Sequence, residues 1–572
     1  MLLTLALPTA ALAKRSVYVV GDSSDNVAAL DVGVAGFLTP TIGSPFAAGA
    51  DPVSVAMTPD GRRAYVTNAG TVPPSVSAYN VTPTGGLAPI AGSFFVGTLP
   101  LGNAVTPNGR FMYVNNRGSK DVSAFEIHGT GALTVVPGSP FPVLGSPTGI
   151  ALSADGRFLY TQNEEGTVSA LTVGADGTLG AVPGTPFASG GIDTWAGAVT
   201  PDGRFLYVVN QGSNTLSAFA VGADGSLALL PGFPVASGGP VPSGIAIAPD
   251  GRHLYAMTST TVAGFAISPA GGLAPVPGSP VALLGARSGA LTPDGSRLYV
   301  AVSGIGKSVA GFAVGADGSL TALNGSPFEA GVDNPDVQAL AIAPNQGPTA
   351  SFSSTVAGDG KVVFNGSASA DPDGTVARYD WDFGDGATAP NGGVAPSHTY
   401  KAPSTYAATL TVTDDEGCSA SFVFTGQTAS CNGGPAARFK ADVAVAAPPP
   451  SVPKPKLTLR GGKVQRLGKW IVVTVVSDVE AKLVASGRLL AKPAARGAVA
   501  SKAGKRSFRL GGRTASAKAG KVVKLKLRVP RPARRAAAKA LASGGKARAK
   551  LTVKATDGGK TGKAKRTVKL RE

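Results

Sequence analysis

Residues 54–68 read Ser54-Val55-Ala56-Met57-Thr58-Pro59-Asp60-Gly61-Arg62-Arg63-Ala64-Tyr65-Val66-Thr67-Asn68 and decide the fold. Small and β-branched residues alternate before the Pro-Asp-Gly turn, and a Tyr-Val pair follows it. Pro fixes φ in such a turn, Asp binds the backbone, and Gly accepts a positive φ. The stretch therefore predicts two antiparallel strands joined by a tight turn.

The same pattern recurs along the first 347 residues. Its tyrosines are Tyr18, Tyr65, Tyr113, Tyr160, Tyr207, Tyr255 and Tyr299, with spacings of 47, 48, 47, 47, 48 and 44 residues. A second phrase, Gly138-Ser139-Pro140-Phe141, also has seven copies in near-variant form. A period of this length accommodates four short strands, and helical periodicity is absent. The fold class predicted for residues 15–347 is a seven-bladed, all-β propeller.

The two ends of this region complete each other. The first repeat begins at its second strand, Val17–Val20, and a single innermost strand, Val337–Ala343, remains after the seventh repeat. Pairing of these segments would close the ring and remove two exposed strand edges. These repeats resemble the lactonase-like seven-bladed propellers, also called the YVTN repeat family. That resemblance implies the ring fold; it implies lactone hydrolysis only weakly, because most members have no assigned activity.

Residues 348–432 resemble the polycystic kidney disease (PKD) domain, an Ig-like β-sandwich. The matching motifs are Asp371-Pro372-Asp373-Gly374, Tyr379-Asp380-Trp381-Asp382-Phe383-Gly384-Asp385-Gly386 and His398-Thr399-Tyr400. The resemblance implies an extracellular spacer or a module that binds protein or sugar. Trp381 and Phe383 are expected to point into the sandwich core.

Acidic residues and cysteines of this module allow specific predictions. Asp371, Asp373, Asp382 and Asp385 are either calcium ligands or turn caps, and we favour caps because a full set of oxygen ligands at loop spacing is missing. His398 is expected to pack beside Tyr400. The two cysteines, Cys418 and Cys431, are predicted to form one disulfide, since the chain has no others and is expected to be exported.

Charge divides the chain in two. Residues 451–572 hold 34 Lys and Arg and 4 Asp and Glu, a net charge of +30, which leaves −12 on the first 450 residues. Residues 433–455 are predicted to be a Pro-rich linker. Residues 456–572 alternate apolar and basic residues, include a predicted helix at Ala533–Ala542, and resemble basic Ig-like tails of exported actinobacterial proteins. A polyanion is the expected partner of this tail. The alternative is that the lysines and arginines only keep the module soluble and protect its edge strands.

The N-terminus predicts export. An apolar stretch, Leu2–Leu7, precedes Ala11-Leu12-Ala13, which fits the end of a signal peptide cleaved after Ala13. The alternative is an apolar first strand. No run of the sequence approaches the roughly 18 apolar residues of a membrane span. Residues 1–13 are therefore predicted to be a signal peptide, and the protein to be extracellular or attached to the cell surface.

Few residues suggest chemistry. We find no Ser-His-Asp triad, P-loop, zinc spacing or dinucleotide fingerprint, so no catalytic residue, metal site or cofactor is predicted. Ligand-binding groups on a propeller would lie over the channel, in the loops before the innermost strands and between the second and third strands. There Asp193, Trp195, Arg287 and Asp336 depart from the repeat and are the candidate ligand-binding residues. Asn68, Asn115 and Asn210 obey the repeat and are expected to be structural.

Three functions compete. The favoured hypothesis is a monomeric secreted or cell-surface interaction protein, with the propeller as a platform for an unknown protein or sugar, the PKD domain as a spacer and the tail as an electrostatic anchor to envelope polyanions or carbohydrate. The alternative is a lactone hydrolase, 6-phosphogluconolactonase-like, acting in the channel. Nucleic-acid binding by the tail is disfavoured, because export is expected and aromatic residues are sparse among the basic ones.

Overall fold

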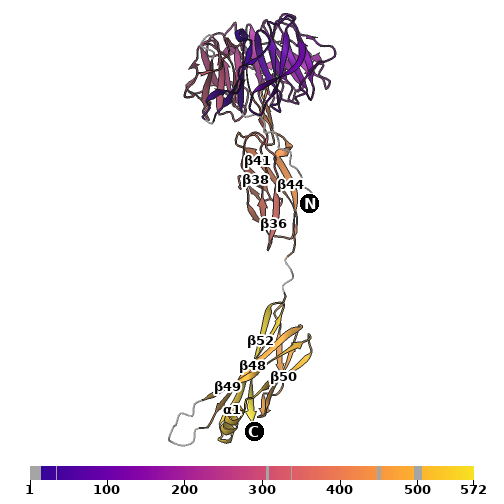
Figure 1. Ribbon diagram of the computed structural model, residues 1–572, viewed down its shortest axis with the longest axis vertical. Coiled ribbons are helices and arrows are strands. Elements are labelled where there is room, and N and C mark those ends of the chain that lie inside the picture. The colour runs from indigo at the N-terminus through magenta and orange to yellow at the C-terminus, as the bar shows by residue number, and fades with distance from the viewer. Residues whose placement is uncertain (1–14, 34, 304–307, 337, 448–451, 495–504) are drawn as a thin grey trace. The chain divides into compact units, whose positions relative to one another are not determined.

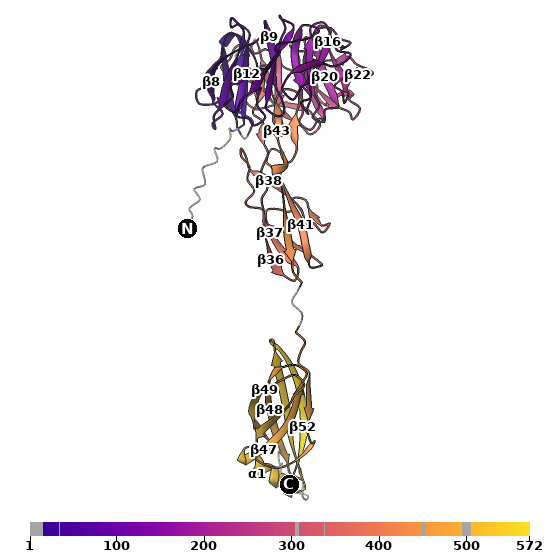
Figure 2. The ribbon, with the colours of Figure 1, turned by 90° about the vertical axis from the view of Figure 1, so that its right-hand side faces the viewer.

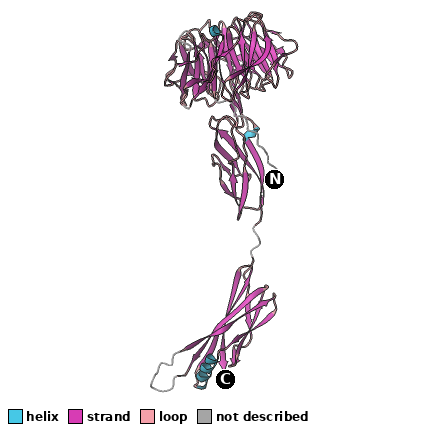
Figure 3. Ribbon diagram, in the orientation of Figure 1, coloured by secondary structure: helices cyan, strands magenta, loops and turns pink. Residues whose placement is uncertain are grey.

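Strands dominate the computed structural model, which describes residues 15–33, 35–303, 308–336, 338–447, 452–494 and 505–572 (Figures 1 and 3). The predicted signal peptide, residues 1–13, lies outside the described residues. The chain forms two compact units, residues 1–447 and 448–572. Each unit is built from its own set of sheets.

Seven four-stranded blades make up the propeller, numbered here from the blade that contains β1. The innermost strands of blades 1 to 7 are β34 (Leu340–Ile342), β5 (Pro52–Met57), β9 (Pro100–Val105), β14 (Pro147–Leu152), β19 (Thr194–Val199), β24 (Gly244–Ile247) and β29 (Ala286–Leu291). The second strands are β1 (Ser16–Gly21), β6 (Arg63–Asn68), β10 (Phe111–Asn116), β15 (Phe158–Asn163), β20 (Phe205–Asn210), β25 (His253–Met257) and β30 (Arg297–Val302).

Outside them lie the third and outermost strands. The third strands are β2 (Asn26–Val32), β7 (Ser75–Val81), β11 (Asp121–Ile127), β16 (Thr167–Val173), β21 (Thr215–Val221), β26 (Thr261–Ile267) and β31 (Ser308–Val314). The outermost strands are β3 (Leu38–Pro40), β8 (Leu87–Phe95), β12 (Leu133–Val135), β17 (Leu179–Ala181), β22 (Leu227–Leu229), β27 (Leu273–Pro275) and β32 (Leu320–Ala322). Except in blade 2, a two-residue strand also pairs with the third strand: β4 (Phe46–Ala47), β13 (Phe141–Pro142), β18 (Phe187–Ala188), β23 (Val235–Ala236), β28 (Val281–Ala282) and β33 (Phe328–Glu329).

The repeated tyrosine joins one blade to the next. Each ring is fully buried, and six of the seven hydroxyls donate to a glycine carbonyl of the neighbouring blade, as Tyr65 does to Gly131 at 3.0 Å and Tyr113 to Gly177 at 2.9 Å. Tyr299 of blade 7 donates to Gly36 of blade 1 at 2.8 Å, which carries the series across the ring closure. The tyrosine of the Tyr-Val motif therefore connects each of these six blades to its neighbour.

Ring closure follows the prediction. β34 pairs antiparallel with β1, with Val17 opposite Ile342 and Val19 opposite Leu340. Blade 1 thus contains strands from both ends of the propeller sequence. Only three residue pairs make this ladder, so closure depends on further contacts as well.

The PKD domain is a β-sandwich. One sheet has the order β36 (Ser353–Gly358), β37 (Lys361–Asn365) and β40 (Ser397–Thr399); the other has β39 (Thr388–Ala389), β38 (Val376–Asp382), β41 (Ser404–Asp414) and β44 (Arg438–Val445). Trp381 and Phe383 are buried between them, as predicted. The ring of His398 stacks on Phe383 and lies edge-on to Tyr400, which confirms its packing role.

The predicted linker is too long at its start. Residues 438–445, placed in the linker by the sequence, form β44, which pairs with β41 over eight residues. The Pro-rich composition begins only after this strand, at Ala446-Ala447-Pro448. The alternation of polar and apolar residues in Arg438–Val445 is weak, because several of these residues and their neighbours are alanines, and the sequence therefore did not predict a strand here.

The second unit is also a two-layer sandwich. Its sheets have the orders β45 (Leu457–Arg460), β47 (Trp470–Ser477), β50 (Val522–Arg528), and β46 (Val464–Arg466), β52 (Lys560–Arg571), β51 (Lys546–Asp557), β48 (Ala481–Lys492), β49 (Arg506–Ala517). The helix α1 (Arg531–Ala542) covers the expected Ala533–Ala542 and buries Ala533, Ala537 and Ala540. Aliphatic side chains from both sheets and this helix form one core.

Candidate functional site

A hairpin of the PKD domain enters one end of the propeller channel. It consists of β42 (Phe422–Phe424) and β43 (Ala429–Asn432), and Figure 2 shows β43 at the propeller. This is the end where the Pro-Asp-Gly turns lie, since β34 runs out of the propeller there toward β35 (Asn345–Gln346), which pairs with β43. We call it the sealed end, and the opposite end the open end.

The hairpin tip binds four successive blades in order. The amide of the last residue of each innermost strand donates to it: Met57 to Thr428 Oγ1, Val105 to the Gln427 carbonyl, Leu152 to the Gly426 carbonyl and Val199 to the Thr425 carbonyl, at 3.4, 3.5, 2.7 and 3.2 Å. These four residues hold equivalent positions in blades 2 to 5. The tip therefore satisfies backbone donors that an empty channel would leave facing solvent.

Side chains and a disulfide hold the hairpin. Phe424 is 1% exposed and packs in one cluster with Ala104, Ile150 and Leu152 of the propeller. Cys418 and Cys431 form the predicted disulfide, with a Cα–Cα distance of 5.6 Å. Arg15, just before the first propeller strand, forms an ion pair with Glu416 beside this disulfide. The hairpin is thus fixed by backbone, core and charge contacts together.

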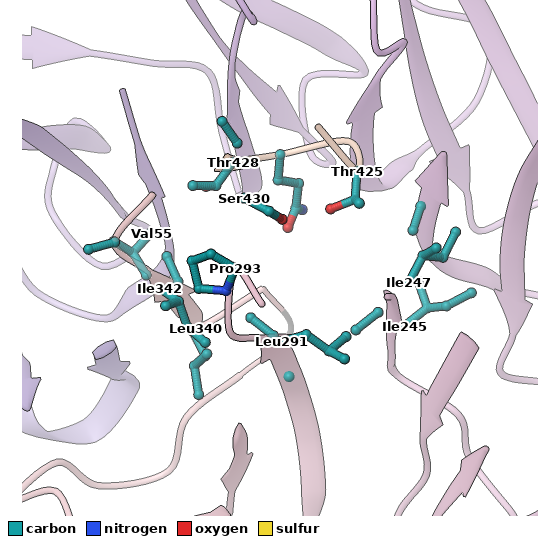
Figure 4. A pocket seen from close by; sticks show the side chains of 18 of the residues that line it. Val55, Ile245, Ile247, Leu291, Pro293, Leu340, Ile342, Thr425, Thr428 and Ser430 are labelled. Atoms are coloured by element: carbon teal, nitrogen blue, oxygen red, sulfur yellow. The ribbon is translucent and has the colours of Figure 1, made fainter. Parts of the chain in front are cut away.

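A small cavity remains between the hairpin and the propeller wall. It measures about 80 Å³ and is lined by the innermost strands of blades 5, 6, 7, 1 and 2, among them Ile247, Leu291 and Ile342. The hairpin contributes residues that include Thr425 and Ser430 (Figure 4). Ligand pockets for small molecules measure roughly 300–1,000 Å³. This cavity has room for a few water molecules only, and it is too small for a sugar-sized substrate.

Two of the predicted site residues meet at the open end. Asp193, with φ of 58°, accepts a hydrogen bond from Trp195 Nε1 at 2.8 Å. Next to them Arg117 of blade 3 binds Glu164 of blade 4 through two hydrogen bonds, of 2.7 and 3.1 Å. Burial is the main reason that the pKa of Asp193 is raised, and Glu164 adds to it while Arg117 opposes it. These four side chains form a network across blades 3 to 5.

The other two predicted residues lie apart from this network. Asp336 is near Asp22, because its charge helps to raise the pKa of Asp22, after burial and Asp51. Arg287 donates from Nε to Ser303 Oγ at 2.9 Å within blade 7. Among the described interactions, Asp193 therefore binds Trp195, and neither of these two residues binds Arg287 or Asp336.

The amides expected to be structural do hold strand ends. Asn68 accepts from the Gly49 amide and donates to Ser77 Oγ, and Asn210 donates to Ser217 Oγ. In blade 3 the residue at this repeat position is Asn116, which donates to Ser123 Oγ, and not Asn115. Asn115 instead donates to the Pro147 carbonyl of blade 4. The doubled asparagine made the register ambiguous.

Polar groups along the channel wall are incompletely paired. Gln162 is fully buried, and neither its amide nitrogen nor its oxygen has a hydrogen-bond partner among the described residues. Gln338 donates to the Ile150 carbonyl at 3.1 Å, a contact from blade 1 to blade 4, but its oxygen is likewise unpaired there. Sequence analysis missed both glutamines, which depart from the repeat as the predicted residues do.

The acidic residues of the PKD domain behave in two ways. Asp382 and Asp385 cap the turn as predicted, accepting from the amides of Gly384 and Ala387. In contrast, burial and the neighbouring Asp373 raise the pKa of Asp371 to about 7, and burial raises that of Asp373 to about 6. Among the described residues, no group of three or more His, Cys, Asp or Glu has an arrangement that could hold a metal ion.

The second unit carries a cationic sheet face. Basic residues alternate with buried aliphatic ones, and several stand directly opposite another basic residue on the next strand. These pairs are Arg488 with Arg509, Arg488 with Lys550, Lys492 with Lys546, Arg548 with Lys569, and Lys554 with Lys563. Like charges placed opposite each other destabilise a sheet. Stability of the sheet therefore does not explain this arrangement.

No helix in the described part of the chain is long and apolar enough to cross a membrane.

Comparison with known proteins identifies the two modules of the first unit. Residues 11–140 and 147–281 match the family described as "Lactonase, 7-bladed beta-propeller", and residues 345–427 match the PKD domain. A solved structure of a candidate 6-phosphogluconolactonase from Bacteroides uniformis is 20% identical and aligns with a TM-score of 0.50 over 57% of this chain and 99% of that one. This likeness concerns the fold alone.

Two curated relatives match short stretches of this chain. The pre-pro-metalloprotease PrtV of Vibrio cholerae is 41% identical over 73 residues, which are 13% of this chain and 8% of the relative. A microbial collagenase of Vibrio alginolyticus is 38% identical over 64 residues, 11% of this chain and 8% of the relative. The chain thus spans less than a tenth of these relatives. It contains a lactonase-like seven-bladed propeller followed by a PKD domain.

Proposed function

We propose that this is an exported binding protein attached to the cell envelope: the open end of the propeller binds a macromolecule, and the basic unit attaches the chain to envelope polyanions. Export is supported by the N-terminal sequence, by the PKD domain and by relatives named as a pre-pro-metalloprotease and a microbial collagenase. The PKD domain is more than the spacer expected from the sequence, since its hairpin seals the channel.

The observation that carries the proposal is the set of opposed basic residues on the cationic sheet face. Five such pairs concentrate positive charge on one surface, and the described ion pairs involve none of these residues. A surface with this cost in repulsion gains stability when an anionic polymer lies across it. Outside the cell such polymers are wall polymers, acidic polysaccharides and anionic lipid headgroups.

The attachment is tested with purified cell envelope. The full chain is expected to sediment with envelope and to be released by half-molar salt, because exposed charges are screened over a few ångströms at that ionic strength. A variant with Arg548, Lys550, Lys554, Lys563 and Lys569 changed to Gln should lose retention. Its matched control changes five basic residues on or beside the other sheet and should retain most of the binding; they are Arg460, Lys521, Lys524, Lys526 and Arg528. Retention that survives both the salt and the first variant refutes the attachment.

Lactone hydrolysis is the second candidate function, and the fold likeness favours it. Against it, His128, His253 and His398 all lie away from the open end of the channel: in a loop of blade 3, at the start of β25 and in the PKD domain. Glu164 is bound to Arg117, which leaves Asp193 as the base with the most suitable position. We expect no appreciable turnover of gluconolactones. Turnover that disappears in Asp193→Ala, with Arg287→Ala as a comparison, would establish the enzyme.

A further inference from the structure

The open end displays an arc of aliphatic side chains. In each of blades 3 to 7, the turn that leads into the innermost strand carries one large aliphatic residue that is exposed to solvent. They are Leu99 at 58%, Leu144 at 59%, Ile192 at 66%, Val241 at 40% and Leu284 at 60%. Single exposed aliphatic residues are ordinary, but one in the same turn of five successive blades is a patterned apolar surface. We call these five residues the aliphatic arc.

The turns hold the arc rigidly. The amide of Arg117 binds the Leu99 carbonyl at 3.0 Å, that of Gly212 binds the Ile192 carbonyl at 3.0 Å, and the amide of Val241 binds Asn214 Oδ1 at 2.7 Å. Each bond joins the turn to the loop between the second and third strands. A side chain held out by a fixed backbone loses little entropy when it is bound.

Backbone strain shows that the fold does not require these residues. Leu99 and Val241 have φ of 48° and 50°, a region that suits glycine and is exceptional for a β-branched residue. The neighbouring turns of blades 4 and 7 place Gly145 and Gly285 at positive φ beside Leu144 and Leu284. Leu99 and Val241 therefore cost stability where glycine would relieve it, a feature typical of functional positions.

Next to the arc lies an acidic sector in blades 1 and 2. It consists of Asp22, Asp25 and Asp51, and the described turns that carry these three residues contain no lysine or arginine. Asp22 and Asp51 are close enough for each other's charge to matter. The sector repels anionic lipid headgroups and acidic polysaccharides and attracts cations.

We propose that the aliphatic arc and the acidic sector together bind an extended polypeptide segment in which lysine or arginine stands beside aliphatic residues. The inference rests on the proposed function, in which the open end is the binding surface, and it names the class of partner. Aliphatic side chains favour a partner with apolar side chains of its own, and the acidic sector selects a basic one.

Binding is measured by fluorescence anisotropy with the full chain and a short labelled peptide of alternating lysine and leucine. The matched peptides replace every leucine by serine or every lysine by glutamate. We expect binding only of the lysine–leucine peptide, with a marked dependence on salt. Equal binding of the serine peptide removes the arc from the proposal, and binding of neutral phosphatidylcholine vesicles in place of the peptide assigns the surface to a membrane; either result overturns it.

Variants locate the surface. The triple change Leu144→Ser, Ile192→Ser and Leu284→Ser should weaken peptide binding by about tenfold or more, whereas Val135→Ser with Leu229→Ser, on the outermost strands, should leave it unchanged. Val241→Gly should weaken binding while raising the melting temperature, because it relieves the strained φ. Asp22→Asn with Asp51→Asn should reduce the salt dependence. Unchanged binding in the triple variant refutes the inference, whereas failed envelope retention refutes only the attachment of the basic unit.

Discussion

The two ends of the propeller channel are treated in opposite ways. At the sealed end, a hairpin satisfies the backbone donors of four blades and buries Phe424 in the core. At the open end, five aliphatic side chains face solvent, and inside the channel the amide of Gln162 and the oxygen of Gln338 lack partners among the described residues. The repeated residues of the blades form the channel wall. Residues that depart from the repeat are what make one end a contact with the PKD domain and the other end a candidate binding surface.

Removing the central contact of the sealed end should have the largest effect. Phe424→Ala deletes a fully buried ring from the cluster shared by hairpin and propeller, which should destabilise the first unit by about 3–5 kcal/mol. The measurement is urea denaturation of the full chain. Phe95→Ala, at a ring that is 55% exposed, is the control and should cost less than about 1 kcal/mol. Equal effects of the two variants would show that the hairpin is not part of the folded core.

Opening the disulfide is the next test of the same joint. The double change Cys418→Ala and Cys431→Ala should lower the free energy of unfolding by about 2–3 kcal/mol. The disulfide closes a short loop and thereby reduces the conformational entropy of the unfolded chain. Differential scanning calorimetry measures the change. If the melting transition is unaffected, the hairpin is held by its tip alone.

The acidic pair beside the joint predicts a dependence on pH. The pKa of Asp371, raised to about 7 from an ordinary 3.8, means that the folded state binds more protons than the unfolded state between these values. The protonated Asp371 carboxyl therefore does not lower the free energy of unfolding below about pH 4. Its ionisation lowers this free energy progressively as the pH rises through about 7. Asp371→Asn should raise the melting temperature by about 1–3 °C at pH 8, and the gain should shrink on acidification. A lower melting temperature of this variant at pH 8 would mean that the carboxylate is stabilising.

The ion pair of the open end should matter least for stability. Arg117 and Glu164 are partly exposed, and exposed pairs contribute about 0.2–1 kcal/mol. Arg117→Ala should therefore lower the free energy of unfolding by no more than about 1 kcal/mol, and Glu164→Gln by a similar amount. A loss comparable to that of Phe424→Ala would make the open end a structural element too and would abolish the contrast between the ends.

Sequence patterns predicted what is periodic. The seven tyrosines, the turns and the unpaired strand predicted the blade number and the closure, because each blade repeats the same local chemistry. The hairpin was not predictable in this way: Met57 and Thr428, which bond to each other, are 371 residues apart, and Thr425-Gly426-Gln427-Thr428 has no counterpart in the propeller.

The candidate site was predicted only in part. Asp193 and Trp195 were found because they depart from the repeat. Arg287 and Asp336 also depart from it, but in other blades, and a departure from the repeat does not show which residues lie close to one another in space. Asp371 and Asp382 have similar local sequences, and only burial, which is a property of the packed domains, separates a carboxylate with a raised pKa from a turn cap. The aliphatic arc could have been found by comparing the turns blade by blade, since each holds a large aliphatic residue next to glycine, proline or a polar residue.

The hairpin also has a mechanical consequence. The propeller and the PKD domain are joined by the covalent passage from β34 to β35 and, separately, by the hairpin tip, which spans four blades. One flexible tether would let the two domains swivel, whereas a second attachment at a distance from the first resists both rotation and extension. A force that pulls on the PKD domain is therefore distributed over several blades. The three-residue ladder between β1 and β34, which closes the ring, does not bear this force alone.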